Sequence, residues 1–205
     1  RVLALTVLAF GTALTSVVVA SPTAAAPDDP EPGRPRPAVV RVESGWLEGA
    51  AGQDHVTFSG VPYAAPPAGE RRFAPPAPPE PWDGVRDATS STSRCPQLRE
   101  DENGVETVVG SEDCLHLGVT LPRGTHRTPP GGARPVLVWV YGGNFVDGAA
   151  GDYGPARLAA EGDLVVVTVN YRVGALGFLS SPALDALGQP SGNYGLEDQA
   201  AALRW

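Results

Sequence analysis

Two runs of apolar, mostly β-branched residues constrain the fold of this chain more than any other feature. They are VLVWVY at residues 136–141 and LVVVTVN at residues 164–170. Runs without polar alternation predict strands buried on both faces, which is typical of a parallel sheet. Between them, residues 155–161 predict a short helix with Pro at its first position and Gly162 at its end. Strand, helix and strand in this order are typical of a right-handed βαβ unit, so the sequence predicts an α/β fold.

Further segments predict strands, one long irregular stretch and a helix. The expected strands are residues 39–43, 46–49 after a turn at Ser44 and Gly45, 55–59 and 115–121. Residues 60–98 are rich in Pro, Gly and aromatic residues. We expect them to form an ordered, irregular segment whose Tyr63, Phe73 and Trp82 pack inward. Residues 196–205 have an amphipathic pattern that predicts a helix.

The N-terminal residues 1–26 have the layout of a secretory signal peptide. Arg1 precedes an apolar segment at residues 2–20, and small residues follow it. We expect cleavage after Ala20 or Ala25. The alternative is a transmembrane anchor, because the segment is near the minimum spanning length, but no basic stop-transfer flank follows it.

The folded part is expected to begin after a linker. Residues 27–38 (PDDPEPGRPRPA) are dense in Pro, which prevents helix and sheet pairing and favours an extended spacer. The domain is therefore expected over residues 39–205, in a secreted protein with no stable membrane anchor after cleavage.

Charge and composition exclude several classes of function. The net charge is −8, and all 15 basic residues are Arg because the sequence contains no Lys. Nucleic-acid binders need a basic surface, so we expect no nucleic-acid partner. The three histidines, His55, His116 and His126, are scattered and fit no metal-binding motif. No G-x-G-x-x-G sequence precedes a helix, and we expect neither a metal nor a cofactor.

The two cysteines, Cys95 and Cys114, predict a disulfide. An even number of cysteines in an exported chain favours pairing. The alternative is a pair of buried free thiols.

A series of short motifs runs through the whole expected domain. In chain order they are FSGVPYA at residues 58–64, RFAPP at 72–76, PWDGV at 81–85, CPQ at 95–97, SEDCL at 111–115, NYRVGALGFL at 170–179 and NYGLEDQ at 193–199. In this order they resemble the type-B carboxylesterases, the α/β-hydrolase family that includes cholinesterases and bacterial para-nitrobenzyl esterases. The resemblance implies the N-terminal portion of an α/β-hydrolase fold: antiparallel N-terminal strands and the start of a mostly parallel central sheet.

The resemblance assigns the oxyanion hole to the loop after residues 136–141. Ester hydrolysis passes through a tetrahedral oxyanion, which backbone N–H groups stabilise. By resemblance, Gly143 and Asn144 donate these N–H groups and Gly142 makes the tight turn. An ordinary Gly-Gly turn at the end of a strand is the alternative. Departures from the family pattern are Tyr141, Asn144, His116 and Gly118, where the family usually has His, a small residue, Tyr and Asn.

No residue of the catalytic triad is identified in this chain. Enzymes of this fold carry the nucleophile in G-x-S-x-G, followed by an acid and then a His. No Ser here has Gly at both positions, and all three histidines precede the expected oxyanion loop. We expect the triad beyond Trp205, and expect the 205-residue chain alone to be inactive.

The resemblance also implies two ion pairs. Arg72 with Glu112 would hold the irregular segment to the strand after Cys114. Arg172 with Asp198 would join the end of the second apolar strand to the last helix. Unpaired surface charges are the alternative.

The function expected from the sequence is that of a secreted serine carboxylesterase. The whole protein would hydrolyse small carboxylic esters through an acyl-Ser intermediate, and this chain would supply its oxyanion loop. A non-catalytic cholinesterase-like interaction domain is one alternative, and a gene fragment without a function of its own is another. The sequence predicts no oligomeric state.

Overall fold

A mixed sheet of seven strands is the framework of the fold, and the termini of its strands position the candidate site. The structure is a computed structural model that describes residues 37–90, 93–123, 133–186, 188 and 190–205. The expected signal peptide, nearly all of the expected linker and His126 lie outside these residues.

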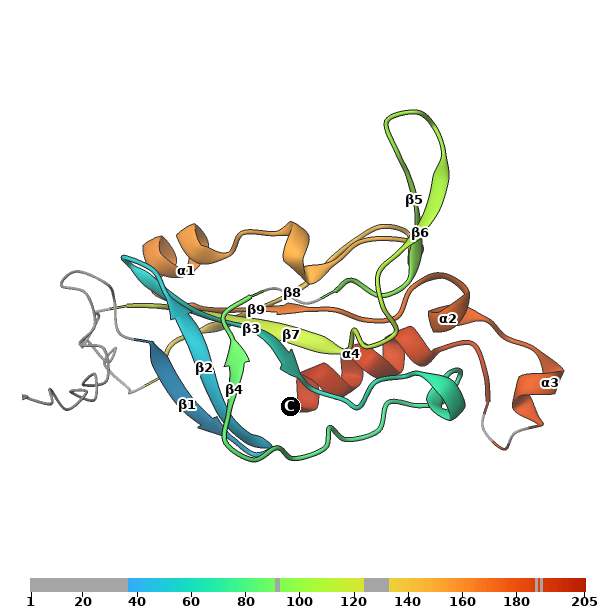
Figure 1. Ribbon diagram of the computed structural model, residues 1–205, viewed down its shortest axis with the longest axis horizontal. Helices are drawn as coiled ribbons and strands as arrows, with labels where there is room; N and C mark the ends of the chain where they lie inside the picture. The colour runs from blue at the N-terminus through green and yellow to red at the C-terminus, as the bar shows by residue number, and fades with distance from the viewer. Residues whose placement is uncertain (1–36, 91–92, 124–132, 187, 189) are drawn as a thin grey trace, which may run out of the picture. The chain divides into compact units, whose positions relative to one another are not determined.

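The sheet has the order β1-β2-β3-β7-β9-β8, with β4 beside β2 (Figure 1). Its strands are β1 (Ala38–Val42), β2 (Gly45–Ala51), β3 (His55–Pro62), β4 (Val85–Ala88), β7 (His116–Pro122), β8 (Val136–Val140) and β9 (Val165–Val169). Neighbours from β1 to β9 pair antiparallel, whereas β8 pairs parallel with β9 and β4 pairs parallel with β2. The predicted parallel pair is therefore confirmed, within an α/β-hydrolase-like mixed sheet.

A separate hairpin and several short helices complete the fold. The hairpin consists of β5 (Gln97–Glu100) and β6 (Glu106–Val109), and it projects away from the main sheet (Figure 1). The helices are α1 (Ala156–Gly162), α2 (Gly174–Phe178), α3 (Pro182–Asp185) and α4 (Tyr194–Arg204), with 3₁₀ turns η1 (Gly69–Arg71) and η2 (Ala150–Asp152). The predicted helices at residues 155–161 and 196–205 correspond to α1 and α4. No helix among the described residues is long and apolar enough to cross a membrane.

Alternating side chains give the sheet two different faces. On one face, Phe58, Val119 and Val167 help to line an apolar groove of about 470 Å³, which Trp205 borders at the end of α4. On the other face, the hydroxyls of Thr57 and Thr120 lie 3.0 Å apart. These threonines line a cavity together with Ala150, Gly151, Tyr153 and Pro155, which precede α1. The period of two along each strand therefore separates an apolar layer from a polar one.

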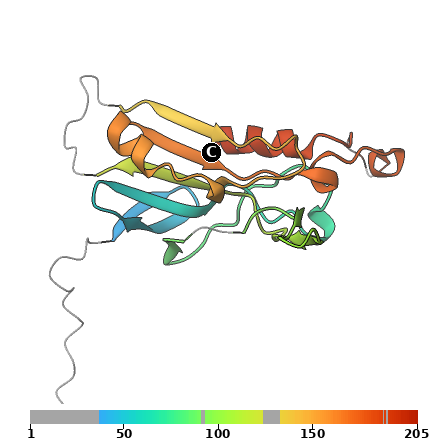
Figure 2. The ribbon, with the colours of Figure 1, turned by 90° about the horizontal axis from the view of Figure 1, so that it is seen from above.

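The expectation that both apolar runs are buried on both faces is wrong for the first. β8 lies at a margin of the sheet (Figure 2), and Val136, Val138, Trp139 and Val140 are 60%, 38%, 43% and 39% exposed. Among the described residues, no strand pairs with its outer side. β9 lies inside the sheet, and its alternate residues are buried.

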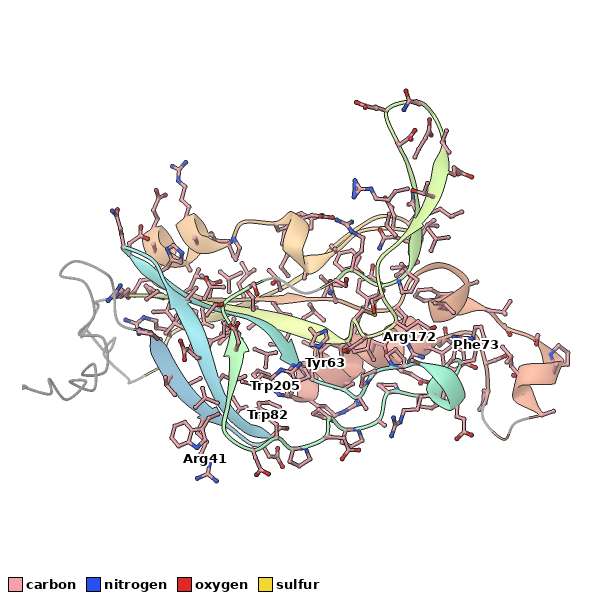
Figure 3. All side chains as sticks on the ribbon, viewed as in Figure 1. Arg41, Tyr63, Phe73, Trp82, Arg172 and Trp205 are labelled. Carbon is pink, nitrogen blue, oxygen red and sulfur yellow. A yellow bond between two sulfur atoms is a disulfide. The ribbon has the colours of Figure 1, made fainter. Side chains whose placement is uncertain are left out.

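The segment at residues 60–98 is largely irregular, as predicted, but β3 and β5 include its two ends, and η1 and β4 interrupt it. Figure 3 shows its Tyr63, Phe73 and Trp82 side chains spaced along it. Tyr63 is buried and donates its hydroxyl to the carbonyl oxygen of Asn170 at 2.6 Å. Trp82 packs against the core and donates Nε1–H to the carbonyl oxygen of Trp46 at 2.8 Å. The aromatic residues thus hold this segment against the sheet.

Candidate active site

The turn that follows β8 is the candidate oxyanion loop, and its backbone geometry is unusual. Asn144 and Phe145 have φ values of 53° and 61°, two consecutive left-handed residues that are not glycine. Gly143 has φ of 134°, and a Cβ there would collide with the backbone carbonyl of Asp147. Only glycine therefore fits at position 143 without moving the turn.

The N–H groups of Gly143 and Asn144 are free within the described structure. The carbonyl oxygen of Gly143 accepts hydrogen bonds from Val146 and Asp147 at 2.9 and 3.3 Å, which closes the turn. The hydrogen bonds among the described residues leave the N–H groups of Gly143 and Asn144 without an acceptor. Asn144 is exposed and Gly143 is half-buried. Two adjacent donors at an exposed turn can bind an anionic oxygen from outside.

A pair of tyrosines fixes the start of this turn. The rings of Tyr141 and Tyr171 stack with centroids 4.5 Å apart, and each hydroxyl donates to the carbonyl oxygen of the other residue, at 2.9 and 3.0 Å. Burial raises the pKa of both hydroxyls, so they remain donors at neutral pH. Phe145 packs on Phe178 of α2 at 4.8 Å, and its carbonyl oxygen accepts from Gly174.

Two polar side chains hold the other end of the turn. Gln97 bonds to both backbone polar groups of Gly148: Nε2 donates to the Gly148 carbonyl oxygen at 3.0 Å, and Oε1 accepts from the Gly148 N–H at 2.9 Å. Asn170 accepts from the N–H of Ala150 at 2.8 Å and donates to the carbonyl oxygen of Ser93 at 3.2 Å. Gln97 and Asn170 belong to the CPQ and NYRVGALGFL motifs, but the sequence alone did not predict a role for either residue.

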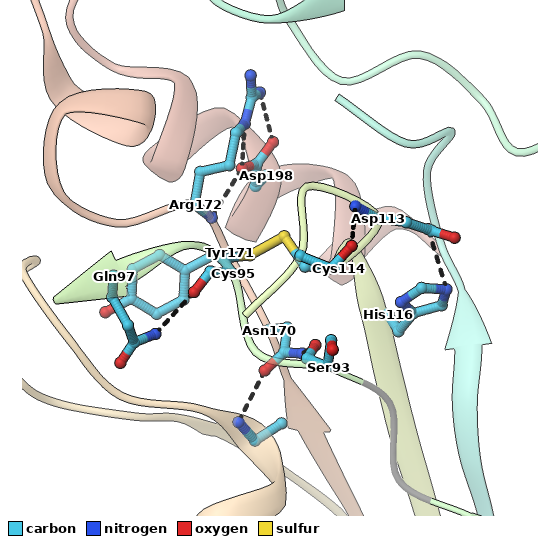
Figure 4. Close-up of a disulfide and its surroundings, with 12 residues drawn as sticks. Ser93, Cys95, Gln97, Asp113, Cys114, His116, Asn170, Tyr171, Arg172 and Asp198 are labelled. Atoms are coloured by element: carbon cyan, nitrogen blue, oxygen red, sulfur yellow. Dashed lines mark hydrogen bonds and ion pairs between the residues drawn. A yellow bond between two sulfur atoms is a disulfide. The ribbon is translucent and has the colours of Figure 1, made fainter. Parts of the chain in front are cut away.

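Cys95 and Cys114 form a disulfide in this structure, with Cα atoms 5.1 Å apart. Figure 4 shows Gln97, Ser93 and Asn170 close to it. Both cysteines are buried, and the bond closes the base of the β5–β6 hairpin. Beside it, Arg94 pairs with Asp152 of η2 at 2.8 Å. The disulfide therefore lies next to the residues that hold the candidate oxyanion turn.

Both ion pairs implied by the resemblance are present in the structure. Arg72 donates two hydrogen bonds to Glu112, from Nε at 2.6 Å and from Nη2. This pair is partly exposed, and the Arg72 guanidinium lowers the pKa of the Glu112 carboxyl. Arg172 donates to Asp198 from Nε at 2.8 Å and from Nη2 at 2.7 Å, and both side chains are almost completely buried.

The described histidines do not gather into a site. His55 contacts its neighbour Asp54 at 2.8 Å. His116 is buried on β7, with Nε2 3.6 Å from Asp113 and no hydrogen-bond partner for Nδ1. Across residues 37–90, 93–123 and 133–205, apart from 187 and 189, no three His, Cys, Asp or Glu side chains gather to hold a metal ion.

Comparison with known proteins gives consistent matches. The sequence model of the Carboxylesterase family matches residues 36–205. The chain is 44% identical over 193 residues to the Fumonisin B1 esterase of Sphingopyxis macrogoltabida, which covers 91% of this chain and 33% of that protein. It is 40% identical to the Para-nitrobenzyl esterase of Bacillus subtilis (strain 168), covering 82% of this chain and 34% of that protein.

Solved structures agree with the sequence relatives. A PNB esterase structure superposes with a TM-score of 0.70 at 40% identity, covering 82% of this chain and 33% of that chain. A carboxylesterase of Geobacillus stearothermophilus superposes with a TM-score of 0.68, also at 40% identity, covering 82% of this chain and 34% of that chain. The chain thus spans about a third of the length of these relatives. Because the family model matches residues 36–205, which include all of the described residues, the chain belongs to the carboxylesterase family.

Proposed function

We propose that this chain is the oxyanion-binding part of a secreted serine carboxylesterase that hydrolyses small carboxylic esters. The observation that carries the proposal is the pair of free N–H groups at Gly143 and Asn144, on a turn that only glycine can make at position 143. Membership in the carboxylesterase family gives the reaction class.

In the proposed reaction, a serine hydroxyl attacks the ester carbonyl and a histidine takes the serine proton. The carbonyl oxygen becomes an oxyanion, which the Gly143 and Asn144 N–H groups stabilise. The alcohol then leaves with a proton from the histidine, and water hydrolyses the acyl-Ser intermediate. The serine, the acid and the histidine are not residues of this chain under the proposal, because no Ser here is flanked as G-x-S-x-G requires.

The first test is hydrolysis of para-nitrophenyl acetate by the product of the reading frame continued past Trp205. We expect turnover that an organophosphate abolishes, and no turnover above a heat-treated control for the 205-residue chain. An extended protein with a residue other than Ser at the elbow and no turnover would instead support the non-catalytic interaction domain.

A second test displaces the donors without removing a side chain that contacts the ester. In the active extended protein, Gly143→Ala forces a Cβ against the Asp147 carbonyl, so the turn must shift. We expect kcat to fall by about 10²-fold, the scale for loss of an oxyanion donor. Asn144→Gly keeps the N–H and relieves the left-handed strain, so kcat should stay within about threefold. The control is Gly154→Ala, where a Cβ meets no atom within 4 Å.

Export is proposed from the apolar segment at residues 2–20 and the disulfide between Cys95 and Cys114. N-terminal sequencing of protein recovered from the culture medium should begin at Ser21 or Ala26. Protein that keeps residues 1–20 in the membrane fraction would support an anchor instead.

A further inference from the structure

The amide nitrogen and the amide oxygen of Gln97 both have hydrogen-bond partners, and two of the three bonds go to the backbone of a single residue, Gly148. Its Nε2 donates to the carbonyl oxygens of Cys95 and Gly148, and its Oε1 accepts from the Gly148 N–H. Gln97 is 6% exposed. A buried side chain that binds both the N–H and the carbonyl oxygen of Gly148 fixes the position and orientation of the backbone at this residue.

Gly148 lies at the end of the candidate oxyanion turn, and its backbone is tightly enclosed. Its φ is 121°, and a Cβ there would collide with the Tyr141 ring and lie 2.9 Å from the Gly142 carbonyl oxygen. The adjacent residue Asp147 donates its N–H to the Gly143 carbonyl oxygen. A displacement of Gly148 is therefore transmitted through Asp147 to the peptide unit that joins Gly143 to Asn144. That unit carries the Asn144 N–H.

Gln97 also connects this turn to the disulfide. It lies two residues after Cys95 and bonds to the carbonyl oxygen of Cys95 at 2.9 Å, as Figure 4 shows. The disulfide joins Cys95 to Cys114, which lies just before β7. The side-chain amide of Gln97 is therefore held at a defined distance from the main sheet. The turn, the amide and the disulfide form one connected support.

We propose that Gln97 is a positioning residue for ester hydrolysis, which holds the backbone of Gly148 and thereby aims the Gly143 and Asn144 N–H groups at the oxyanion. This inference rests on the proposed esterase function. Gln97 acts through the turn and does not contact the ester. A glutamine fits this role because one amide presents a donor and an acceptor side by side, matching the carbonyl oxygen and the N–H of a single residue.

The kinetic test compares Gln97→Met and Gln97→Glu in the protein extended past Trp205, with the active sites counted by organophosphate titration. Gln97→Met keeps the length of the side chain but bonds to neither group of Gly148. We expect kcat per active site to fall about tenfold, a fraction of the 10²–10³ for losing a donor, with KM within about twofold. The matched control is Gln53→Met, at an exposed glutamine between β2 and β3.

Gln97→Glu adds a signature that a purely structural role would not give. An ionised carboxyl has acceptors only, so it repels the Gly148 carbonyl oxygen, whereas a protonated carboxyl donates to it. The ratio of variant to wild-type kcat should therefore rise as the pH falls from about 8 to about 5, through the range to which burial raises a Glu pKa. The same ratio for Gln97→Met should not change with pH.

A second readout does not depend on activity. Hydrogen–deuterium exchange of the peptide covering residues 142–149 should be at least about tenfold faster in Gln97→Met, while exchange in α1 stays unchanged. Unchanged exchange at residues 142–149 overturns the inference, whether or not the protein is an esterase. Unchanged kcat in an active protein also overturns it, whereas an inactive wild-type protein would refute only the proposed function.

Discussion

Arg172 and Asp198 place opposite charges where water does not reach them. Their side chains are 2% and 0% exposed. Besides Asp198, Arg172 donates to the Ala74 carbonyl oxygen at 2.9 Å and lies over the Tyr194 ring. One guanidinium thus joins the end of β9, the irregular segment and α4. The local fold depends on this pair because each charge has the other as its main compensation.

Breaking this pair should cost far more than breaking an exposed one. We expect Asp198→Asn to lower the free energy of unfolding by about 3–5 kcal/mol, because an uncompensated guanidinium stays buried. Glu161→Gln, which breaks the exposed pair with Arg157 on α1, is the control and should cost less than about 0.5 kcal/mol. Urea denaturation measures both, and equal losses would contradict a structural role for Arg172.

We expect the buried His116 to make the folded protein less stable in mild acid. Burial lowers its pKa, Asp113 raises it and Arg86 lowers it, and the net shift is downward. The unfolded chain therefore binds more protons than the folded one just below the ordinary His pKa. The stabilising contribution is present above pH 6.5 and is lost as the pH falls towards the folded value. In the variant His116→Gln, the melting temperature should fall less between about pH 7 and pH 5 than in the wild-type protein. Equal slopes of melting temperature against pH in the two proteins would contradict this.

At the scale of elements, the Cys95–Cys114 bond should stabilise the whole domain as well as the hairpin it closes. Its sequence separation is 19. Closing a loop of this size in the unfolded chain stabilises the fold by about 3 kcal/mol. We expect the double variant Cys95→Ser, Cys114→Ser to lose about this much in chemical denaturation. Equal denaturation midpoints with and without a reductant would contradict the prediction.

Patterns of side chains predicted those elements that bury one face or both. β1, β2, β3 and β7 follow from alternation and turn signals, and β9 follows from its unbroken apolar run. Helix α1 follows from Pro155 and Gly162 at its ends, and α4 from its amphipathic pattern. The hairpin β5–β6 was missed because it buries little besides Gln97 at its base: its apolar residues Leu98 and Val108 are 54% and 74% exposed. β4 was missed because its parallel pairing with β2 depends on a contact between segments far apart in the sequence.

The site was predictable only as far as local backbone chemistry determines it. Gly142, Gly143 and Asn144 mark a turn after a strand, and the structure contains that turn. Gln97 was not assigned because its partner Gly148 is 51 positions away in sequence, and nothing local to either residue signals the bond. Likewise, the sequence VLVWV at residues 136–140 predicts a strand, but the burial of this strand depends on which other segments pack against it.

At the scale of the whole molecule, the described fold leaves the outer side of β8 unpaired and exposes an apolar face of the sheet. β8 offers its outer backbone groups, and the apolar groove lies on the sheet face that ends at Trp205. An exposed apolar edge strand pairs readily with other chains. The 205-residue chain should therefore associate with itself.

A charge on this strand should reduce the association. We expect Val138→Lys to lower light scattering of the 205-residue chain at equal concentration, because a lysine on an edge strand opposes pairing. Val138→Thr keeps the β-branched shape without a charge and is the control. Equal scattering of the Lys and Thr variants would contradict pairing through β8.

The hairpin that projects from the sheet has a consequence for proteolysis. A protease that cuts its exposed tip, near residues 101–105, breaks the backbone between two cysteines that remain covalently joined. The two pieces would stay together as one particle until a reductant separates them. The projecting hairpin is thus a place where the polypeptide can be interrupted, or lengthened by evolution, while Gln97 and the turn it holds stay attached to the sheet.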